Sequence, residues 1–441
     1  MRITGSILAI IMLIIGVIAG YAGGSIVSQP RPPQIATATV TVAQPQITTI
    51  TQSIVQASYG LQGEIPIGAL LPLSGAGASD GARMRVAVLM AQDDLNNFVK
   101  NLGIPVTFRV LIEDTATDPT TALNKLTSLY ARGVRTSEGP YTSAELRAIR
   151  AYANSNKIVL CSQSTAADLA LPDYAFRLPT NDLFQAKALA RLVMDYGVKY
   201  TAIIYRNDPW GKGLADSFSS RFTALGGSIV GSPIPYDPTT SYFSSYVATL
   251  ASIVRDAVTR YGAKNVAVVT MSFDEIVAIL SASQGYPELM GITWFGTDVT
   301  AGNPKVISEV GVVAARVKLI STVFAVTSSP VYQALNQRYR AIGGGEDMGT
   351  YAATAYDCIW LIGLSILLAG KNDGEAIAKV FPQVASRYFG ASGWTLLDEN
   401  GDRAAGSYDI FAVTISDGKP TWIRVATWDS TTDKVTWITK I

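Results

Sequence analysis

From Glu64 onward the sequence alternates between short apolar runs and longer stretches with helical spacing. The run "IPIGALLPL" (65–73) is typical of a buried strand, and the next stretch places Met84, Val88 and Leu95 on one helical stripe. Further strands are expected over 106–114, 157–162, 201–205, 266–271 and 292–295, and further helices over 183–196, 213–225, 242–261 and 273–282. Such alternation predicts an α/β fold with parallel, doubly wound sheets. Because the body is long for one sheet, we expect two lobes.

The composition narrows the possible functions. The chain has 441 residues, a net charge of +1, no His and two Cys. A net charge near zero removes the electrostatic case for binding nucleic acid. The lack of His excludes His-based catalysis and His-ligated metals, and we expect neither a metal nor a cofactor. Cys161 and Cys358 lie in apolar segments, so we expect two buried free thiols rather than a bridge.

The N-terminus has the character of a targeting segment. Arg2 precedes a nearly uncharged apolar stretch that ends at Gly24, long enough to span a bilayer. We expect residues 1–27 to be a membrane anchor, with a cleaved signal peptide as the alternative. Residues 28–60 are rich in Thr, Gln and Pro, which is typical of a tether. The single preceding positive charge favours an orientation with the globular body outside the cell.

Ligands of doubly wound sheets bind beyond the carboxyl ends of the strands, so the residues that follow each strand are candidates. In the first half these are hydroxyl residues at predicted helix starts: Ser74, Thr142, Ser143, Ser164 and Thr165. Hydroxyls together with free N–H groups at helix starts can hold a carboxylate. Each of these residues could instead be an ordinary helix N-cap, a position that Ser and Thr favour.

The second half offers two aromatic residues and an acid at the corresponding places. "RNDPWGKG" (206–213) lacks the spacing of a phosphate-binding loop, so Trp210 needs another explanation. Phe273 and Asp298 follow the next two strands, and Asp298 could also be a cap or turn residue. A carboxylate site, an acid for an ammonium group and rings for an apolar body together predict an α-amino acid as ligand.

The order of these segments resembles the periplasmic branched-chain amino-acid-binding proteins, the two-lobe type I solute receptors of ABC importers. The resemblance spans about 64–425 and rests on "GALLPLSG", "EDTATDPTTALNKL", "GPYTSAE", "SQSTAADL", "YRNDPWGKGL" and "FGTDVTAGN". It implies that Ser143, Ser164 and Thr165 contact the ligand from the first lobe. It also implies that Trp210 and Phe273 cover the ligand and that Asp298 binds its ammonium group.

The resemblance has departures as well. Asp80 stands where an aromatic residue of the family often lines the pocket, and the paired cysteines that some members carry in the first lobe are absent. "LLDENGDR" (396–403) resembles the late turn of the family and lacks the later acidic ligands of a calcium loop. These departures leave the side-chain preference of the site open.

The implied architecture is two lobes joined by a three-strand hinge. Lobe 1 would comprise 61–180 and 323–393, and lobe 2 would comprise 181–322 and 394–441, with crossings near 179–181, 321–324 and 393–395. The implied function is capture of a small, branched-chain or other apolar amino acid for an ABC permease, by a monomer at the cell membrane. The alternatives are an amide or urea receptor and a ligand-sensing ectodomain of the same fold. A hydrolase is disfavoured because no Ser or Cys has a His to activate it.

Overall fold

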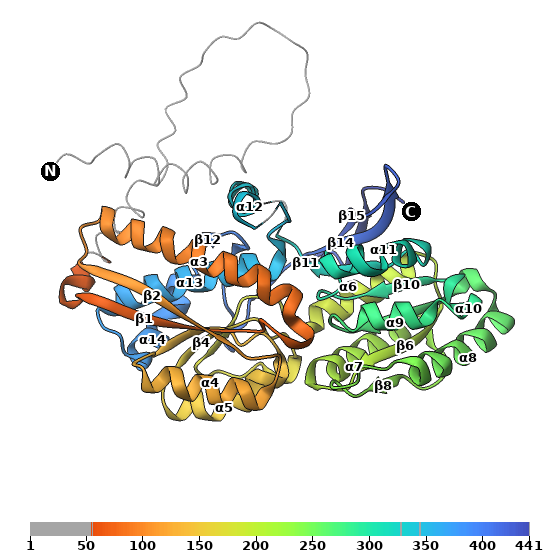
Figure 1. Cartoon of the computed structure of the whole chain (residues 1–441), viewed down its shortest axis with the longest axis horizontal. Helices are drawn as coiled ribbons and strands as arrows, with labels where there is room; N and C mark the ends of the chain where they lie inside the picture. The colour runs from red at the N-terminus through yellow and green to blue at the C-terminus, as the bar shows by residue number, and fades with distance from the viewer. Residues whose placement is uncertain (1–53, 55, 327–328, 344, 441) are drawn as a thin grey trace, which may run out of the picture.

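The computed structural model describes residues 54, 56–326, 329–343 and 345–440. The predicted anchor or signal segment (1–27) and most of the predicted tether lie outside the described residues. The described part forms two α/β lobes side by side (Figure 1). Its short 3₁₀ helices are η1 (Ser58–Gly60), η2 (Gly75–Gly77), η3 (Ala167–Leu169) and η4 (Ala263–Asn265).

Lobe 1 is built on five strands that all run parallel. In spatial order they are β2 (Val106–Asp114), β1 (Gly63–Leu71), β3 (Thr136–Glu138), β4 (Val159–Ser162) and β5 (Ala175–Arg177). The last five residues of β1 are buried. A strand with such a continuous apolar run requires cover on both faces of its sheet.

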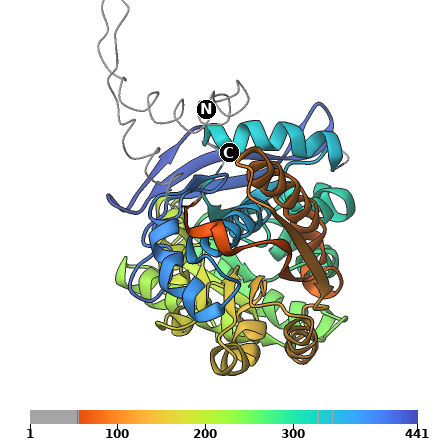
Figure 2. The ribbon, with the colours of Figure 1, turned by 90° about the vertical axis from the view of Figure 1, so that its left-hand side faces the viewer.

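Helices supply this cover on both faces of the first sheet (Figure 2). Ile67 and Leu71 of β1 join the core formed with α3 (Ala78–Asn101) and α13 (Gly349–Ala369). Leu70 points to the other face and joins the core formed with α4 (Pro119–Ala131) and α5 (Ser143–Ser155). The alternation follows from the two-residue period of a strand. Further elements of this lobe are α12 (Pro330–Ile342), α14 (Gly374–Ala385) and the hairpin of β12 (Phe389–Gly390) and β13 (Gly393–Trp394).

Lobe 2 has a larger, mixed sheet. Its parallel part contains β6 (Tyr200–Arg206), β9 (Val266–Met271), β10 (Thr293–Gly296) and β11 (Ile320–Phe324), with β7 (Ser228–Ile229) and β8 (Ile234–Tyr236) beside β6. Three antiparallel strands extend it beyond β11: β14 (Tyr408–Ser416), β15 (Lys419–Asp429) and β16 (Lys434–Trp437). The α/β fold with parallel sheets is therefore confirmed, and the C-terminal antiparallel extension is an addition that the strand–helix alternation did not predict.

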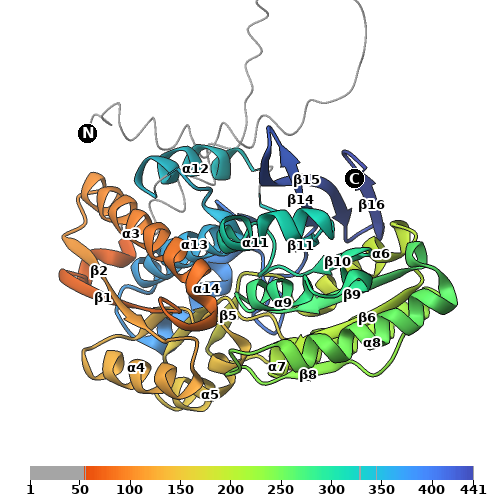
Figure 3. The same ribbon diagram turned by 45° about the vertical axis from the view of Figure 1, so that its right-hand side comes forward.

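Helices also cover both faces of the second sheet (Figure 3). Val269 of β9 joins the core that includes α6 (Asp182–Asp195) and α7 (Pro209–Ala224). Val268 points the other way, into the core of α8 (Ser244–Tyr261), α9 (Ile276–Ser283), α10 (Pro287–Met290) and α11 (Pro304–Arg316). Each lobe therefore has a doubly covered sheet of its own.

Three segments connect the lobes and lie close together. The hydroxyl of Thr180 is 2.8 Å from that of Tyr408, and the N–H of Ala325 donates to the carbonyl of Ser407 at 2.9 Å. The turn at 398–403 stays with lobe 1, because Asp402 forms a buried ion pair with Arg177 of β5. We therefore place the crossings at 178–181, just after β11 and at 404–407, the third one later than 393–395.

The two cysteines form a disulfide, so the prediction of two free thiols is wrong. Cys161 lies in β4 and Cys358 lies in α13, and the two are 197 residues apart in sequence. α13 packs across β4 in the core of lobe 1, which brings the two Cα atoms to 5.6 Å, a typical distance for a disulfide. The apolar surroundings that suggested free thiols are those of the buried contact between β4 and α13.

Among the described residues, α13 is the one helix long and apolar enough to cross a membrane by length and composition. However, 78% of its most apolar window is buried inside the protein. Asp357 in its middle accepts hydrogen bonds from the N–H groups of Ala391 and Ser392, at 2.8 and 2.7 Å. α13 is therefore the central core helix of lobe 1.

Candidate functional site

The carboxyl ends of the parallel strands in both lobes meet at a small cavity between the lobes. Its walls come from the loops after β3, β4, β6, β9 and β10 and from the start of α13: Tyr141, Thr142, Ser143, Gln163, Ser164, Thr165, Trp210, Phe273, Val299 and Tyr351. The cavity measures about 10 Å³, barely the volume of one water molecule. With the lobes at this separation, it is too small for an amino acid.

The three hydroxyl residues predicted for lobe 1 all line this cavity. The Oγ of Ser143, at the start of α5, accepts from the N–H groups of Thr165 and Ala166 at 3.3 and 3.1 Å. The N–H of Ser164 donates to Ser162, whose hydroxyl also contacts the Ser164 hydroxyl at 3.0 Å. These bonds hold two loops against each other and present a polar wall. Thr142, rather than Ser143, is the N-cap of α5 and forms a full capping box with Glu145.

The aromatic wall of lobe 2 contains Trp210 and Phe273, both buried and in contact, with ring centroids 4.8 Å apart. α7 begins at Pro209, earlier than predicted, so Trp210 lies in its first turn. The carboxylate of Asp208 caps this turn by accepting from the N–H of Gly211 at 2.8 Å. A Cβ on Gly211 would lie 2.1 Å from the carbonyl oxygen of Arg206. The glycine therefore lets the first turn of α7 approach β6 and directs Trp210 into the cavity.

Arg206, at the end of β6, contacts the ring of Phe273 and holds the acid that caps the turn of Trp210. Its guanidinium group lies 4.8 Å from the centre of the Phe273 ring and pairs with Asp208 and Glu275. The carboxylate of Glu275 also accepts from the N–H of Phe273 at 2.8 Å. One buried arginine thus connects the caps and loops that position Trp210 and Phe273. Its pKa is raised, because the carboxylates of Glu275 and Asp208 outweigh the lowering effect of burial.

Asp298 is buried directly behind the cavity wall. Its carboxylate accepts from the hydroxyl of Tyr351, which lines the cavity, and from the N–H of Val299 at 3.1 Å. Burial raises the pKa of Asp298, and the hydrogen bond from Tyr351 opposes this rise. No basic side chain of the described residues pairs with Asp298. It is therefore a buried acid without a compensating positive charge next to the cavity.

Ser74 and Asp80 lie away from the cavity lining. Ser74 is exposed, and its hydroxyl donates to Asp114 at 2.7 Å, which joins the loop after β1 to the end of β2. Asp80 is buried, forms an ion pair with Arg83 and accepts from the hydroxyl of Tyr141 at 2.7 Å. Asp80 thus supports a ring that lines the cavity, and Ser74 connects two loops at its periphery.

Four lining residues were missed by the sequence reasoning: Tyr141, Gln163, Val299 and Tyr351. Tyr141, Gln163 and Val299 are neighbours of predicted residues in the same loops, so the loops themselves were the available signal. Tyr351 lies in the first turn of α13 and follows no strand, so no pattern indicated it.

Two buried polar side chains of α6 also face this region. The side chain of Gln185 interacts with the carboxylate of Asp298 and that of Thr165 with the carboxylate of Asp182, and each contact lowers the pKa of its acid. Burial and the nearby charge of Asp298 raise the pKa of Asp182 well above its usual range. Asp182 and Gln185 thus place a second acid and an amide next to Asp298.

The lobes contact each other directly beside the cavity. The hydroxyl of Ser79 donates to Asp274 at 2.8 Å, and the N–H of Asp274 donates to the carbonyl of Ala76 at 3.1 Å. The guanidinium group of Arg83 donates to the carbonyl of Gly302 at 3.1 Å. The segment formed by η2 and the first turns of α3 therefore contacts two loops of lobe 2.

The sequence "LLDENGDR" folds as a turn. One oxygen of Asp398 accepts from the N–H groups of Asn400 and Asp402, at 2.9 and 3.0 Å. The carboxylate of Asp402 is already engaged in its ion pair with Arg177. Within the described ranges, no three His, Cys, Asp or Glu residues gather where they could hold a metal ion.

Two doubly covered lobes, with a cavity of hydroxyls and rings between them and a buried carboxylate behind its wall, are the architecture of the type I periplasmic-binding-protein fold. The profile of the family described as the receptor family ligand binding region matches residues 83–416, and the chain belongs to that family. An uncharacterized protein of Methanocaldococcus jannaschii is 32% identical over 414 residues, which cover 89% of this chain and 95% of that protein.

Solved structures share the fold. The leucine-binding protein LivK of Thermotoga maritima is similar with a TM-score of 0.71 and 21% identity, over 83% of this chain and 99% of its own. A solute-binding protein of an ABC transporter from Rhodopseudomonas palustris, in complex with 4-hydroxybenzoate, gives a TM-score of 0.70 and 18% identity, over 83% and 97% of the chains. The predicted family and fold are therefore confirmed. The ligands named for these neighbours differ in chemistry.

Proposed function

We propose that the chain captures a small α-amino acid with an apolar side chain between its lobes and delivers it to an ABC permease. The observation that carries this proposal is the buried carboxylate of Asp298, which has no basic partner among the described residues. A buried carboxylate is stabilised by an opposite charge with good hydrogen-bond geometry. The ammonium group of an amino acid would supply that charge.

The remaining walls fit the other groups of an amino acid. Ser143, Ser164 and Thr165 offer hydroxyl and backbone groups from lobe 1, where a carboxylate could be held. Trp210 and Phe273 offer apolar ring surface from lobe 2. An aromatic carboxylic acid such as 4-hydroxybenzoate would bring a negative charge toward Asp298 without an ammonium group. The neutral amide expected as the alternative ligand would leave Asp298 uncompensated.

The capture mechanism would be closure of the lobes about the three crossings. A cavity of about 10 Å³ requires the lobes to separate before an amino acid can enter. Bonds such as that between Ser79 and Asp274 would break on opening and reform on closing. A ligand that contacts both lobes stabilises only the closed arrangement and therefore shifts the equilibrium toward it.

Calorimetry of the full-length chain against the twenty amino acids, simple amides and 4-hydroxybenzoate tests this proposal. We expect Leu, Ile or Val to bind and to stabilise the protein by about 2.7 kcal/mol at one hundred times the dissociation constant. Asp298→Asn keeps the shape and can still accept from Tyr351, but it removes the charge. We expect it to weaken amino-acid binding by roughly 3–5 kcal/mol, or two to four decades.

Asp216→Asn is the matched control, because Asp216 is an exposed acid on α7 of the same lobe. It should leave the affinity within about threefold of wild type, well under one decade. If Asp298→Asn also stays within that range, Asp298 is a structural residue. If 4-hydroxybenzoate or an amide binds and none of the amino acids does, the amino-acid proposal is wrong.

We further propose an extracytoplasmic location with the N-terminal segment as a membrane anchor. The Cys161–Cys358 disulfide supports an oxidising compartment, where such bonds form and persist. Mass spectrometry of the native protein tests the anchor. A mature N-terminus between Gly20 and Gln29 would show that the segment is a cleaved signal peptide.

A further inference from the structure

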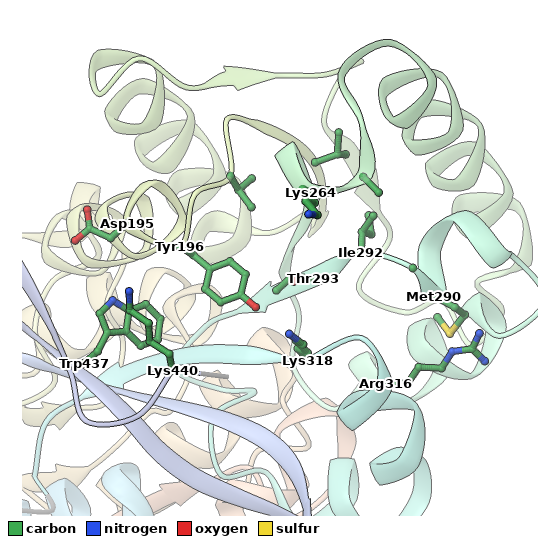
Figure 4. Close-up of a pocket in the computed structure, with 14 residues that line it drawn as sticks. Asp195, Tyr196, Lys264, Met290, Ile292, Thr293, Arg316, Lys318, Trp437 and Lys440 are labelled. Atoms are coloured by element: carbon green, nitrogen blue, oxygen red, sulfur yellow. The ribbon is translucent and has the colours of Figure 1, made fainter.

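A second pocket lies at the opposite end of lobe 2, where the parallel strands of its sheet begin (Figure 4). Its volume is about 530 Å³, which is within the range of pockets that hold small molecules. Its walls come from the residues before β6, β9, β10 and β11 and from the chain end after β16. Since β6 has seven residues, this pocket is roughly 20 Å from the interlobe cavity.

The pocket carries an excess of positive charge. One acid, Asp195, faces four basic residues in its lining: Lys264, Arg316, Lys318 and Lys440. Among the described residues, none of these four forms an ion pair. By contrast, the neighbouring Arg191 and Arg221 share the carboxylate of Asp433. Like charges gathered in one concave surface raise the local potential and attract anions.

Helix C-termini account for only part of this charge. Arg316 is the last residue of α11, Lys318 lies two residues beyond it, and Lys264 follows the end of α8, where a cation complements the helix dipole. Lys440 follows a strand rather than a helix. Figure 4 shows Lys318 directed toward the middle of the pocket, on the side of the Tyr196 hydroxyl. Lys440 therefore adds a cation that no helix end requires, and all four basic residues line the same pocket.

One side of the pocket offers flat, apolar surface. The partly buried ring of Trp437 lies 6.1 Å from that of Tyr196, and both line the pocket. Met290 and Ile292 add apolar surface on the lining. Aromatic side chains stack on flat ring systems, whereas ammonium and guanidinium groups bind phosphate oxygens. A ligand that satisfies both would combine a planar ring with a phosphate chain.

We propose that this pocket binds a phosphate-bearing small molecule with a planar ring, the chemistry of a nucleotide. The phosphates contact Lys264, Lys318 and Lys440, and the ring stacks on Trp437. The planar surface distinguishes such a ligand from a phospholipid headgroup, which has no aromatic ring to stack. This site is separate from the interlobe cavity and does not depend on the function proposed for that cavity.

Calorimetry of the full-length chain with ATP and with inorganic tripolyphosphate, both with EDTA and at constant ionic strength, tests the proposal. We expect both anions to bind wild type and ATP to bind more tightly. The triple variant Lys264→Gln, Lys318→Gln and Lys440→Gln should weaken both by more than about tenfold. Trp437→Leu should remove the preference for ATP and leave tripolyphosphate binding within about twofold of wild type.

A triple variant with the same change of charge elsewhere is the control: Lys100→Gln, Lys212→Gln and Lys379→Gln. It should bind ATP within about twofold of wild type. Single variants at Lys318 and Lys440 provide the same comparison if the triple variant does not fold, as judged by circular dichroism. The proposal is overturned if wild type binds neither anion, or if the control triple variant loses as much affinity as the pocket variant.

Discussion

Breaking the Cys161–Cys358 disulfide should cost the protein a large part of its stability. The bond joins β4 to α13 and closes a loop across 197 residues of sequence. In the chain-entropy description of a disulfide, a loop of that length corresponds to about 5 kcal/mol at room temperature, and removal of native disulfides typically costs about 2–5 kcal/mol. We therefore expect reduction to lower the free energy of unfolding by about 2–5 kcal/mol.

Urea unfolding followed by tryptophan fluorescence measures this loss in three samples: the oxidised wild type, the reduced wild type and the double variant Cys161→Ala with Cys358→Ala. The reduced protein keeps both buried sulfur atoms, whereas the double variant also loses their packing. The double variant should therefore be the least stable, by about a further 1 kcal/mol. Two titratable thiols in the unreduced native protein, or a reduced protein within about 1 kcal/mol of the oxidised one, would refute the reasoning.

Two further predictions test burial and packing near the interlobe cavity. Burial raises the pKa of Glu138 from its ordinary value of 4.5 to about 8, so the folded protein keeps a proton that the unfolded chain loses. The free energy of unfolding should therefore fall as pH rises from 4.5 to 8, by at most about 1.4 kcal/mol per pH unit. Urea titrations at several pH values measure this fall, and Glu138→Gln should flatten it. Gly211→Ala should destabilise the protein by about 1–3 kcal/mol, because the added Cβ meets a backbone carbonyl. Gly213→Ala places its Cβ in open space on the same helix and should stabilise the protein by about 0.5–1 kcal/mol. Thermal unfolding measures both changes.

The strands of the parallel sheets could be predicted closely because burial on one or both faces leaves a clear apolar pattern, alternating in β2 and continuous in β9. The predicted strands 106–114 and 266–271 coincide with β2 and β9. The loops that follow these strands could be predicted as site loops for the same reason, since carboxyl ends of parallel strands share one edge. Ser143, Ser164, Thr165, Trp210 and Phe273 accordingly line the cavity.

What could not be predicted depends on contacts between distant segments. Tyr351 reaches the cavity because α13 packs against α3, and no pattern near residue 351 encodes that packing. The pairing of Cys161 with Cys358 has the same origin, since each lies in an apolar run that reveals its burial but not its neighbour. The start of α7 was placed late because its Gly residues resemble a loop, while the cap from Asp208 begins the helix at Pro209.

The apolar character of α13 has a consequence for the proposed export of the chain. A protein threaded through a translocation channel before folding exposes each helix to lipid in turn, and α13 has a mean hydropathy of 1.7 over its most apolar window. Asp357 opposes lateral release into the bilayer, because an Asp at the centre of a spanning helix costs about 2.5–3.5 kcal/mol. The carboxylate that ties α13 to Ala391 and Ser392 thus also disfavours insertion of this helix into a bilayer.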